Sequence, residues 1–179
     1  MTIDRWLHPL RRRAAHRQLT QLGLPGSVLF VCHGNVCRSP YAAGAFRRLL
    51  APSIGRTARV DSAGFIGPGR PPPTTAIDAA AARGVDLSAH RSRALTPEGV
   101  RSASIVVVME PEQALTLTRR FGAPVNRILQ LGDLDPSPIE QRAIQDPIDQ
   151  PREVFDTVYA RIDRCLVAWV DTLFQADAD

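Results

Sequence analysis

Cys32 and Arg38 are the residues of this 179-residue chain whose types and spacing most directly indicate chemistry. They enclose the five residues HGNVC, and an apolar run, SVLFV (27–31), leads into Cys32. A tight turn after a strand leaves successive backbone N–H groups pointing inward, and a following helix adds its positive N-terminal end. Such a turn suits a tetrahedral dianion, and Arg38 can grip two of its oxygens with parallel hydrogen bonds. We therefore predict a phosphate-binding loop formed by His33, Gly34, Asn35, Val36, Cys37, Arg38 and Ser39.

The same donors act on the sulfur of Cys32. A thiol at a helix N-terminus beside an arginine loses its proton more readily than a free cysteine does. Ser39 can donate a hydrogen bond to the sulfur and support the loop. Gly34 is expected to supply backbone angles closed to other residues, and Asn35 tolerates the left-handed region. Cys32 is then a thiolate nucleophile placed for in-line attack on phosphorus.

Residues 31–40 resemble the loop of the low-molecular-weight protein tyrosine phosphatases, V-C-x-G-N-x-C-R-S-P, and match every specified position. A Cys-x5-Arg pattern alone occurs by chance, so the structural alternative is a buried strand-end cysteine whose turn happens to contain arginine. The preceding apolar strand and the Gly-Asn and Ser-Pro pairs make the match specific. The resemblance covers about residues 27–174. It implies a phosphatase that needs no metal or cofactor and acts through a phosphocysteine.

The implied reaction needs a carboxyl group that protonates the leaving oxygen and later activates water. The family places this group in an Asp-Pro pair ahead of the last helix, and the chain has two such pairs, Asp135-Pro136 and Asp146-Pro147. The segment QDPIDQPREVFDTVY resembles the family's Asp-Pro segment with its short spacer and helix, so we assign Asp146 as the general acid and base. LGDLDP resembles the stretch that directly follows the last core strand. We therefore interpret Asp135 as a turn residue.

Two further residues are predicted to serve the loop. Ser62 is expected to hydrogen-bond Asn35 and hold the loop open, as the resemblance implies, and simple turn capping is the alternative. Cys37 is close enough to Cys32 to form a reversible disulfide that protects the nucleophile, a pair that the family often carries. The alternative for Cys37 is an inert buried cysteine. Cys165 lies on the apolar face of the last predicted helix and is interpreted as a core residue.

The predicted walls of the pocket depart from the family. Many tyrosine-specific members place aromatic residues after the Asp-Pro pair, whereas this chain has Ile148 and Asp149. Phe65 or Tyr41 could supply an aromatic surface instead. Val36 stands where a relative that dephosphorylates arginine carries threonine, which favours phosphotyrosine. Protein-arginine phosphatase remains the alternative function.

Two rival functions fit the same loop less well. An arsenate reductase on this fold needs further cysteines near residues 80–95, and none occurs between Cys37 and Cys165. A catalytically silent phosphate-binding module would not need Cys32, Arg38 and Asp146 together. The resemblance thus favours a phosphoric monoester hydrolase.

Strands and helices are predicted to alternate along the chain. Apolar runs and turn residues indicate strands at 27–31, 57–64, 104–109 and 125–131, and helices at 40–50, 74–83, 111–121 and 151–174. Segments 67–75 and 132–150, which are rich in proline, are expected to be irregular. This order predicts an α/β fold, a single-domain four-stranded parallel sheet with helices on both faces, of the flavodoxin-like or phosphotyrosine phosphatase I-like kind. Ligands of such folds bind at the carboxyl ends of the strands, where Cys32 stands.

The positive charge of the chain belongs to its first 26 residues. The net charge is +4; residues 1–26 hold five arginines and one acid, which leaves 17 of 22 basic and 17 of 18 acidic residues for the rest. A nucleic-acid-binding domain should instead carry a basic face on its fold. We divide the chain into a basic N-terminal extension, 1–26, and a low-molecular-weight phosphatase domain, 27–179.

The extension has no continuous apolar stretch, so neither a signal peptide nor a membrane span is predicted. Trp6, Leu7, Leu10 and Ala14 could line one face of a short helix with arginines opposite. The preferred interpretation is a frayed or loosely docked leader, and weak contact with an acidic lipid surface or a partner is the alternative.

The three cysteines are odd in number and widely spread, which favours a reducing cytoplasm over a disulfide-stapled secreted scaffold. The expected partner is a phosphotyrosine-bearing protein. By resemblance, this is a bacterial tyrosine kinase of polysaccharide export.

Overall fold

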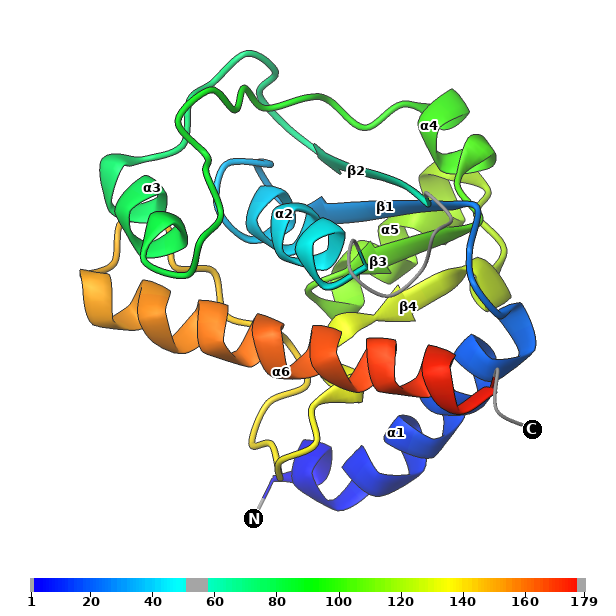
Figure 1. The fold of residues 1–179 in the computed structure, drawn as a ribbon. Helices are drawn as coiled ribbons and strands as arrows, with labels where there is room; N and C mark the ends of the chain where they lie inside the picture. Colours follow the sequence, from blue (N-terminus) through cyan, green and yellow to red (C-terminus); the bar gives the residue numbers. More distant parts are fainter. Residues whose placement is uncertain (1, 51–57, 177–179) are drawn as a thin grey trace.

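Four parallel strands form one sheet in the order β2-β1-β3-β4 (Figure 1) in this computed structural model, which describes residues 2–50 and 58–176. The strands are β1 (Ser27–Cys32), β2 (Arg59–Gly64), β3 (Ile105–Val108) and β4 (Ile128–Gln130). In the central strand, Cys32 pairs with Gly64 and Val31 pairs with Val108. The predicted parallel sheet is confirmed. β4 is shorter than predicted because 125–127 form a 3-10 turn, η1 (Val125–Arg127), and the predicted start of the second strand at Thr57 lies outside the described residues.

The side chains of β1, one of the two inner strands, enter two hydrophobic cores because successive side chains point to opposite faces of a sheet. Phe30 and Cys32 face one core, which α2 (Arg38–Leu50), α3 (Thr74–Ala81) and α6 (Arg152–Ala176) cover. Leu29 and Val31 face the other, which α4 (Pro97–Ser102) and α5 (Pro111–Phe121) cover. A run without polar residues is therefore what this strand requires.

Apart from the helix formed by the first residues, the described helices follow the predicted ones with two exceptions. α3 ends at Ala81, two residues early, and Gly84 closes the turn with φ +74° while the Val85 N–H donates to Ala80 O at 2.9 Å. α4 was not predicted, because its sequence, PEGVRS, is too short and too polar to show a helical period; Thr96 caps it by accepting the Gly99 N–H at 3.0 Å. Residues 135–150 are irregular as predicted, whereas 132–134 belong to a short 3-10 helix, η2 (Leu131–Leu134).

The first residues form a regular helix, α1 (Ile3–Leu22), which packs on α6 and η2. Figure 1 shows it lying along α6, on the side turned away from α2. The expectation of a frayed or loosely docked leader is therefore wrong. The predicted apolar face also differs, because His8, Ala15 and Leu19 are the buried residues of α1, whereas Trp6 and Leu10 are exposed. None of the described helices has both the length and the apolar character needed to cross a membrane.

Candidate active site

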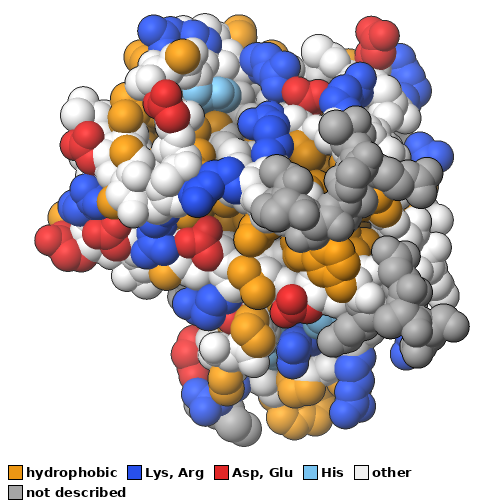
Figure 2. All heavy atoms as spheres, viewed as in Figure 1, with side chains coloured by type: hydrophobic (Ala, Val, Ile, Leu, Met, Phe, Trp, Pro, Cys, Tyr) orange, Lys and Arg blue, Asp and Glu red, His pale blue; other side chains and the backbone are white. Residues whose placement is uncertain are grey.

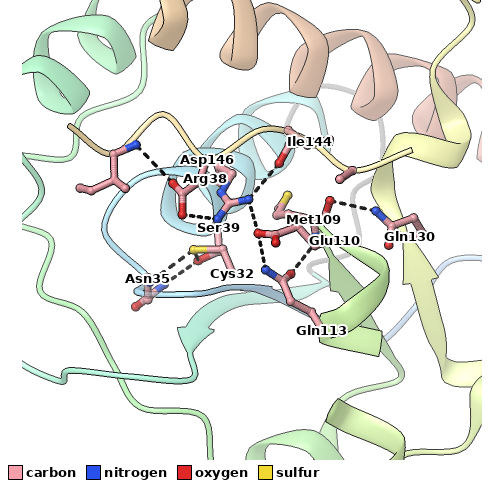
Figure 3. Close-up of polar contacts among 12 residues, drawn as sticks. Cys32, Asn35, Arg38, Ser39, Met109, Glu110, Gln113, Gln130, Ile144 and Asp146 are labelled. Atoms are coloured by element: carbon pink, nitrogen blue, oxygen red, sulfur yellow. Dashed lines mark hydrogen bonds and ion pairs between the residues drawn. The ribbon is translucent and has the colours of Figure 1, made fainter. Parts of the chain in front are cut away.

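The sulfur of Cys32 lies inside the turn that joins β1 to α2 (Figure 3). Cys32 ends the strand and Arg38 begins the helix, so residues 33–37 form the turn at the carboxyl edge of the sheet. The Asn35 N–H donates to Cys32 Sγ at 3.3 Å, and Ser39 Oγ lies 3.1 Å from the same sulfur. Cys32 is 3% exposed. The Asn35 N–H and the Ser39 hydroxyl are thus the polar groups that the structure places against this sulfur.

Asn35 is the residue that fixes the shape of the turn. It has φ +53°, and its side-chain Nδ2 donates to Ser39 Oγ and Ser62 Oγ, both at 2.9 Å. Its Oδ1 accepts the Arg93 N–H at 2.8 Å, and its backbone oxygen lies 2.8 Å from His90 Nε2. The structure thus brings Ser62 to Asn35 as predicted, and it adds two supports, His90 and Arg93, that carry no recognisable pattern in the sequence.

His90 supports the turn as a neutral ring. Burial lowers its pKa, with the carbonyl of Asn35 opposing that effect and neighbouring arginines adding to it. Because a carbonyl oxygen only accepts, His90 Nε2 carries the hydrogen in this bond.

Gly34 does not have the special backbone angle that was expected of it, because its φ is not positive. A Cβ at this position would lie 2.6 Å from Arg70 Nη2, the end of a flexible side chain that donates to Gly34 O at 3.1 Å. Gly64 on the neighbouring strand is restricted more severely, since its Cβ would lie 2.7 Å from the backbone nitrogen of Asn35.

Of the remaining loop residues, His33 has an exposed side chain, and Val36 and Cys37 have buried ones. The His33 side chain is exposed, and its backbone oxygen accepts the Phe65 N–H at 2.8 Å. Val36 and Cys37 are buried beneath the turn. Burial raises the pKa of the Cys37 thiol to about 12, and the nearby Cys32 adds to the effect. Cys37 is therefore a protonated thiol at neutral pH.

Arg38 is buried, and its two terminal nitrogens have partners whereas its Nε has none among the described residues. Its Nη1 donates to Glu110 Oε1 at 2.5 Å and to Ile144 O at 2.9 Å, and its Nη2 donates to Asp146 Oδ2 (Figure 3). Its Nε–H has no partner among the described residues, although a buried donor without an acceptor costs free energy. The guanidinium therefore keeps a hydrogen available for a ligand oxygen.

Glu110 is a residue in contact with Arg38 that the sequence reasoning missed. It lies two residues after the end of β3 and is the N-cap of α5, where its carboxylate also accepts a hydrogen bond from Gln113 Nε2 at 2.9 Å. An acid at the carboxyl end of a buried parallel strand is a signal that could have found it.

The two Asp-Pro pairs lie in different places. Asp146 reaches the loop through Arg38, and its Oδ1 accepts the Ile148 N–H at 3.3 Å. Asp135 is bound to α6 instead, with Arg161 Nε and Arg164 Nη2 each 3.1 Å from its Oδ2. Its Oδ1 accepts the Ser137 N–H at 3.1 Å, which is the turn role expected of it.

Neither proposed aromatic residue lines the mouth of the loop. Tyr41 is buried, stacks on Tyr159 with ring centroids 3.8 Å apart, and donates to Asp163 Oδ1 at 2.7 Å. Phe65 faces Phe121 in the second core. Tyr41 is thus part of the interior, and Phe65 is partly buried against the second core.

Exposed aliphatic residues stand near the loop instead. The Ile66 N–H donates to His33 O at 3.2 Å, and its side chain is 45% exposed. Ile148, two residues after Asp146, is 37% exposed.

The sequence of the chain matches that of known proteins. The family model described as low molecular weight phosphotyrosine protein phosphatase matches residues 27–178. The low molecular weight protein-tyrosine-phosphatase Etp of Escherichia coli K12 is 33% identical over 148 residues, which cover 82% of this chain and 94% of that protein.

Solved structures agree with this assignment. The tyrosine phosphatase Wzb from Escherichia coli K30, in complex with sulphate, is similar with a TM-score of 0.74 and 27% identity, over 84% of this chain and 99% of that one. The YwlE arginine phosphatase from Geobacillus stearothermophilus is similar with a TM-score of 0.73 and 25% identity, over 85% and 95% of the two chains. The chain therefore belongs to the low molecular weight phosphotyrosine protein phosphatase family and is a phosphatase of that family.

Proposed function

We propose that this enzyme hydrolyses phosphotyrosine in proteins through a phosphocysteine on Cys32. The observation that carries the proposal is that three reactive groups converge. The Cys32 sulfur lies within the turn, and Arg38 holds an Nε–H that no other described residue accepts. The Asp146 carboxylate is bonded to that same guanidinium.

Binding is the first step of this mechanism. The N–H groups of the turn and the Arg38 Nε–H donate to the phosphoryl oxygens, which compensates the buried donor. A second guanidinium hydrogen turns from Asp146 to the phosphoryl group. Asp146 is then released toward the leaving oxygen, while Glu110 and Ile144 O keep Arg38 in place.

Transfer and hydrolysis follow. The Cys32 thiolate attacks phosphorus and the bond to the leaving oxygen breaks. Asp146, which takes up a proton from solvent when it parts from Arg38, donates that proton to the leaving oxygen. The resulting Asp146 carboxylate takes a proton from water, which attacks phosphorus and breaks the P–S bond. Ser39, 3.1 Å from the sulfur, stabilises the departing thiolate.

The decisive test uses p-nitrophenyl phosphate in the presence of EDTA. We expect full activity in EDTA, its loss in Cys32→Ser, and a phosphorylated Cys32 after rapid quenching in acid. Turnover without any phosphorus on the sulfur would refute the mechanism.

The aliphatic residues Ile66 and Ile148 support an aryl phosphate as substrate. Cys32 is buried, so a phosphoryl group must be carried inward on a long side chain, and apolar contacts near the turn suit the ring of tyrosine. Phosphoarginine is the second candidate because YwlE has the same fold. Initial rates on phosphotyrosine, phosphoarginine and phosphoserine peptides of one sequence decide between them; a higher kcat/KM on phosphoarginine would reverse the assignment.

We also infer a protective role for Cys37. Peroxide oxidises the Cys32 thiolate to a sulfenic acid, and the Cys37 sulfur then displaces water to form a disulfide. The raised pKa of Cys37 makes this closure slower than for an ordinary thiol. Mass spectrometry after mild peroxide should find a Cys32–Cys37 bond, whereas sulfonic acid on Cys32 would count against it.

For the partner, we propose a phosphotyrosine-bearing protein of the cytoplasm, with a bacterial tyrosine kinase of polysaccharide export as the candidate that the family resemblance implies. The described cysteines are all free thiols, which is in keeping with a reducing compartment. Cells that carry Cys32→Ser should accumulate phosphotyrosine on this kinase. An unchanged phosphorylation state would exclude it as the substrate.

A further inference from the structure

Helix α1 is a part of the described chain that lies outside the family match, which begins at residue 27. One face of it is fixed to the phosphatase fold. His8 Nε2 lies 2.8 Å from Asp135 O, and Thr2 Oγ1 donates to Glu140 O at 2.7 Å. Leu19 is fully buried. The helix is therefore rigidly presented, and its other face needs a separate explanation.

The outer face of α1 consists of Ile3, Trp6, Leu10, Arg13 and Arg17. At about 100° per residue these five lie within about 80° of the helix circumference, opposite the buried residues. Their apolar members are 73%, 67% and 59% exposed in chain order. Figure 2 shows hydrophobic and basic side chains gathered together over α1, at the lower end of the molecule.

The charges around this face are unbalanced. The acid within α1, Asp4, accepts Arg11 Nη1 at 2.6 Å and the Arg142 N–H at 2.8 Å. Glu140, the acid beside the first turn, is paired with Arg5.

The two arginines of the outer face lack such partners. Within residues 2–50 and 58–176, Arg13 and Arg17 have neither an ion pair nor a side-chain hydrogen bond. The outer face thus combines exposed apolar side chains with two uncompensated positive charges.

We propose that the outer face of α1 docks on the surface of an anionic lipid bilayer. Ile3, Trp6 and Leu10 enter the boundary between headgroups and acyl chains, and Arg13 and Arg17 face the lipid phosphates. Apolar residues beside arginines on one face are what a helix lying in the membrane plane requires. Tryptophan is enriched at that depth because its ring is apolar and its N–H is polar.

A lipid surface fits this face better than a second copy of the chain does. The outer face has no acidic residue, so a second copy would offer its arginines no opposite charge. Docking also leaves the active-site loop uncovered: Figure 1 shows α1 along α6, whereas the carboxyl ends of the strands open toward the side where α3 lies. The proposal does not depend on the substrate of the enzyme.

The test uses vesicles of phosphatidylglycerol and phosphatidylcholine, with vesicles of phosphatidylcholine alone for comparison. The full chain is expected to co-sediment with the anionic vesicles only, and less so at high salt. The chain has two tryptophans, and Trp169 is fully buried. A shift of emission to shorter wavelength on binding therefore reports Trp6. Trp6→Phe should keep binding and lose the shift.

Two pairs of substitutions separate the apolar and the electrostatic contributions. Trp6→Ala with Leu10→Ala should weaken partitioning by about tenfold or more. Arg13→Gln with Arg17→Gln should weaken it by roughly fivefold per arginine. All four side chains are exposed, so the fold and the rate on p-nitrophenyl phosphate should not change.

Matched controls come from α5, on the other face of the sheet, and from the turn η1 that follows it. Leu115→Ala with Val125→Ala removes apolar side chains that are 54% and 73% exposed, and Arg119→Gln with Arg120→Gln removes two exposed arginines of α5. Both control pairs should bind as the unchanged chain does.

Three outcomes overturn the proposal. The first is no partitioning into anionic vesicles at low salt, and the second is equal loss in the control pairs. The third is a dimer in analytical ultracentrifugation that Trp6→Ala abolishes while vesicles bind neither protein, since that result assigns the face to a second copy of the chain.

Discussion

The Asp-Pro pairs at 135–136 and 146–147 share a dipeptide and a short stretch of chain, yet they lie in opposite settings. The side chain of Asp135 is 1% exposed and faces two arginines, both from α6. The side chain of Asp146 is 35% exposed and shares a single arginine with Glu110. A carboxylate whose oxygens are all bound inside the protein holds elements together, whereas a half-exposed one beside a shared cation can meet water and substrate. The number and origin of the arginines around each carboxylate, and not the dipeptide, distinguish the structural role of Asp135 from the catalytic role that we propose for Asp146.

The largest expected effect comes from removing the acid on the chemical side of this comparison. Asp146→Ala should lower kcat by about 100- to 10,000-fold, because the leaving oxygen loses its proton donor. Thermal unfolding should change little, since the side chain is partly exposed. Gln145→Ala, an exposed neighbour, is the control. A comparable fall of kcat in folded Asp135→Ala, with Asp146→Ala active, would exchange the two roles.

Asp135→Asn should instead act on stability. It leaves the charges of Arg161 and Arg164 without their buried partner, so the free energy of unfolding should fall by about 3–5 kcal/mol. Urea denaturation measures this loss, and the protein that remains folded should keep its kcat. Asp149→Asn is a matched control, because Asp149 is exposed and asparagine tolerates its φ of +59°. Equal stability of the two variants would contradict the structural role.

Glu110→Gln tests whether the shared arginine needs its second acid. The change removes one charge-assisted hydrogen bond that aims Arg38, so kcat/KM should fall by roughly tenfold. Glu112→Gln, an exposed acid of the same helix, controls for the lost charge. Tighter inhibition by inorganic phosphate in Glu110→Gln would show that Glu110 competes with the ligand and does not position the arginine.

The smallest expected effect is on the pH dependence of stability, through His90, which supports the loop. Burial holds the pKa of His90 below its ordinary value, so the unfolded chain takes up this proton first as pH falls through about 6.5. Stability should therefore decline on acidification from pH 7.5 to 5.5, and part of that decline should be absent in His90→Gln, whose amide can still donate to Asn35 O. The difference between the two pH profiles isolates His90 from His16, whose pKa is also lowered. Identical profiles would remove His90 from the account.

The fold was predictable from local patterns, because β1 and β3 are short apolar runs and turn residues separate the strands from the helices. The run 27–31 alone identifies a strand buried on both faces, and the motif after it places Cys32 at the carboxyl edge. The choice of Asp146 over Asp135 needed the resemblance, since both pairs have the same local chemistry. Helix α4 could not be found because six residues show no period.

The supports of the site could not be predicted because they depend on distant pairings. Arg38 and Glu110 are 72 positions apart, and Asn35 and Arg93 are 58 apart. No local pattern states which carboxylate a given arginine meets. The same reason explains the orientation of α1. Its buried face is set by its contacts with α6 and η2, and Trp6 and Leu10 are left exposed.

The close approach of Gly64 to the turn has a consequence for protein engineering. The backbone of residues 33–35 packs directly against Gly64 at the end of β2. The shape of the turn therefore depends on residues of both β1 and β2. Grafting the seven residues from Cys32 to Arg38 onto another strand and helix would transfer the reactive groups but not the neighbouring strand that fits against the turn. A designer would also have to place a glycine at the end of the adjacent strand, directly opposite the cysteine, as Gly64 is here.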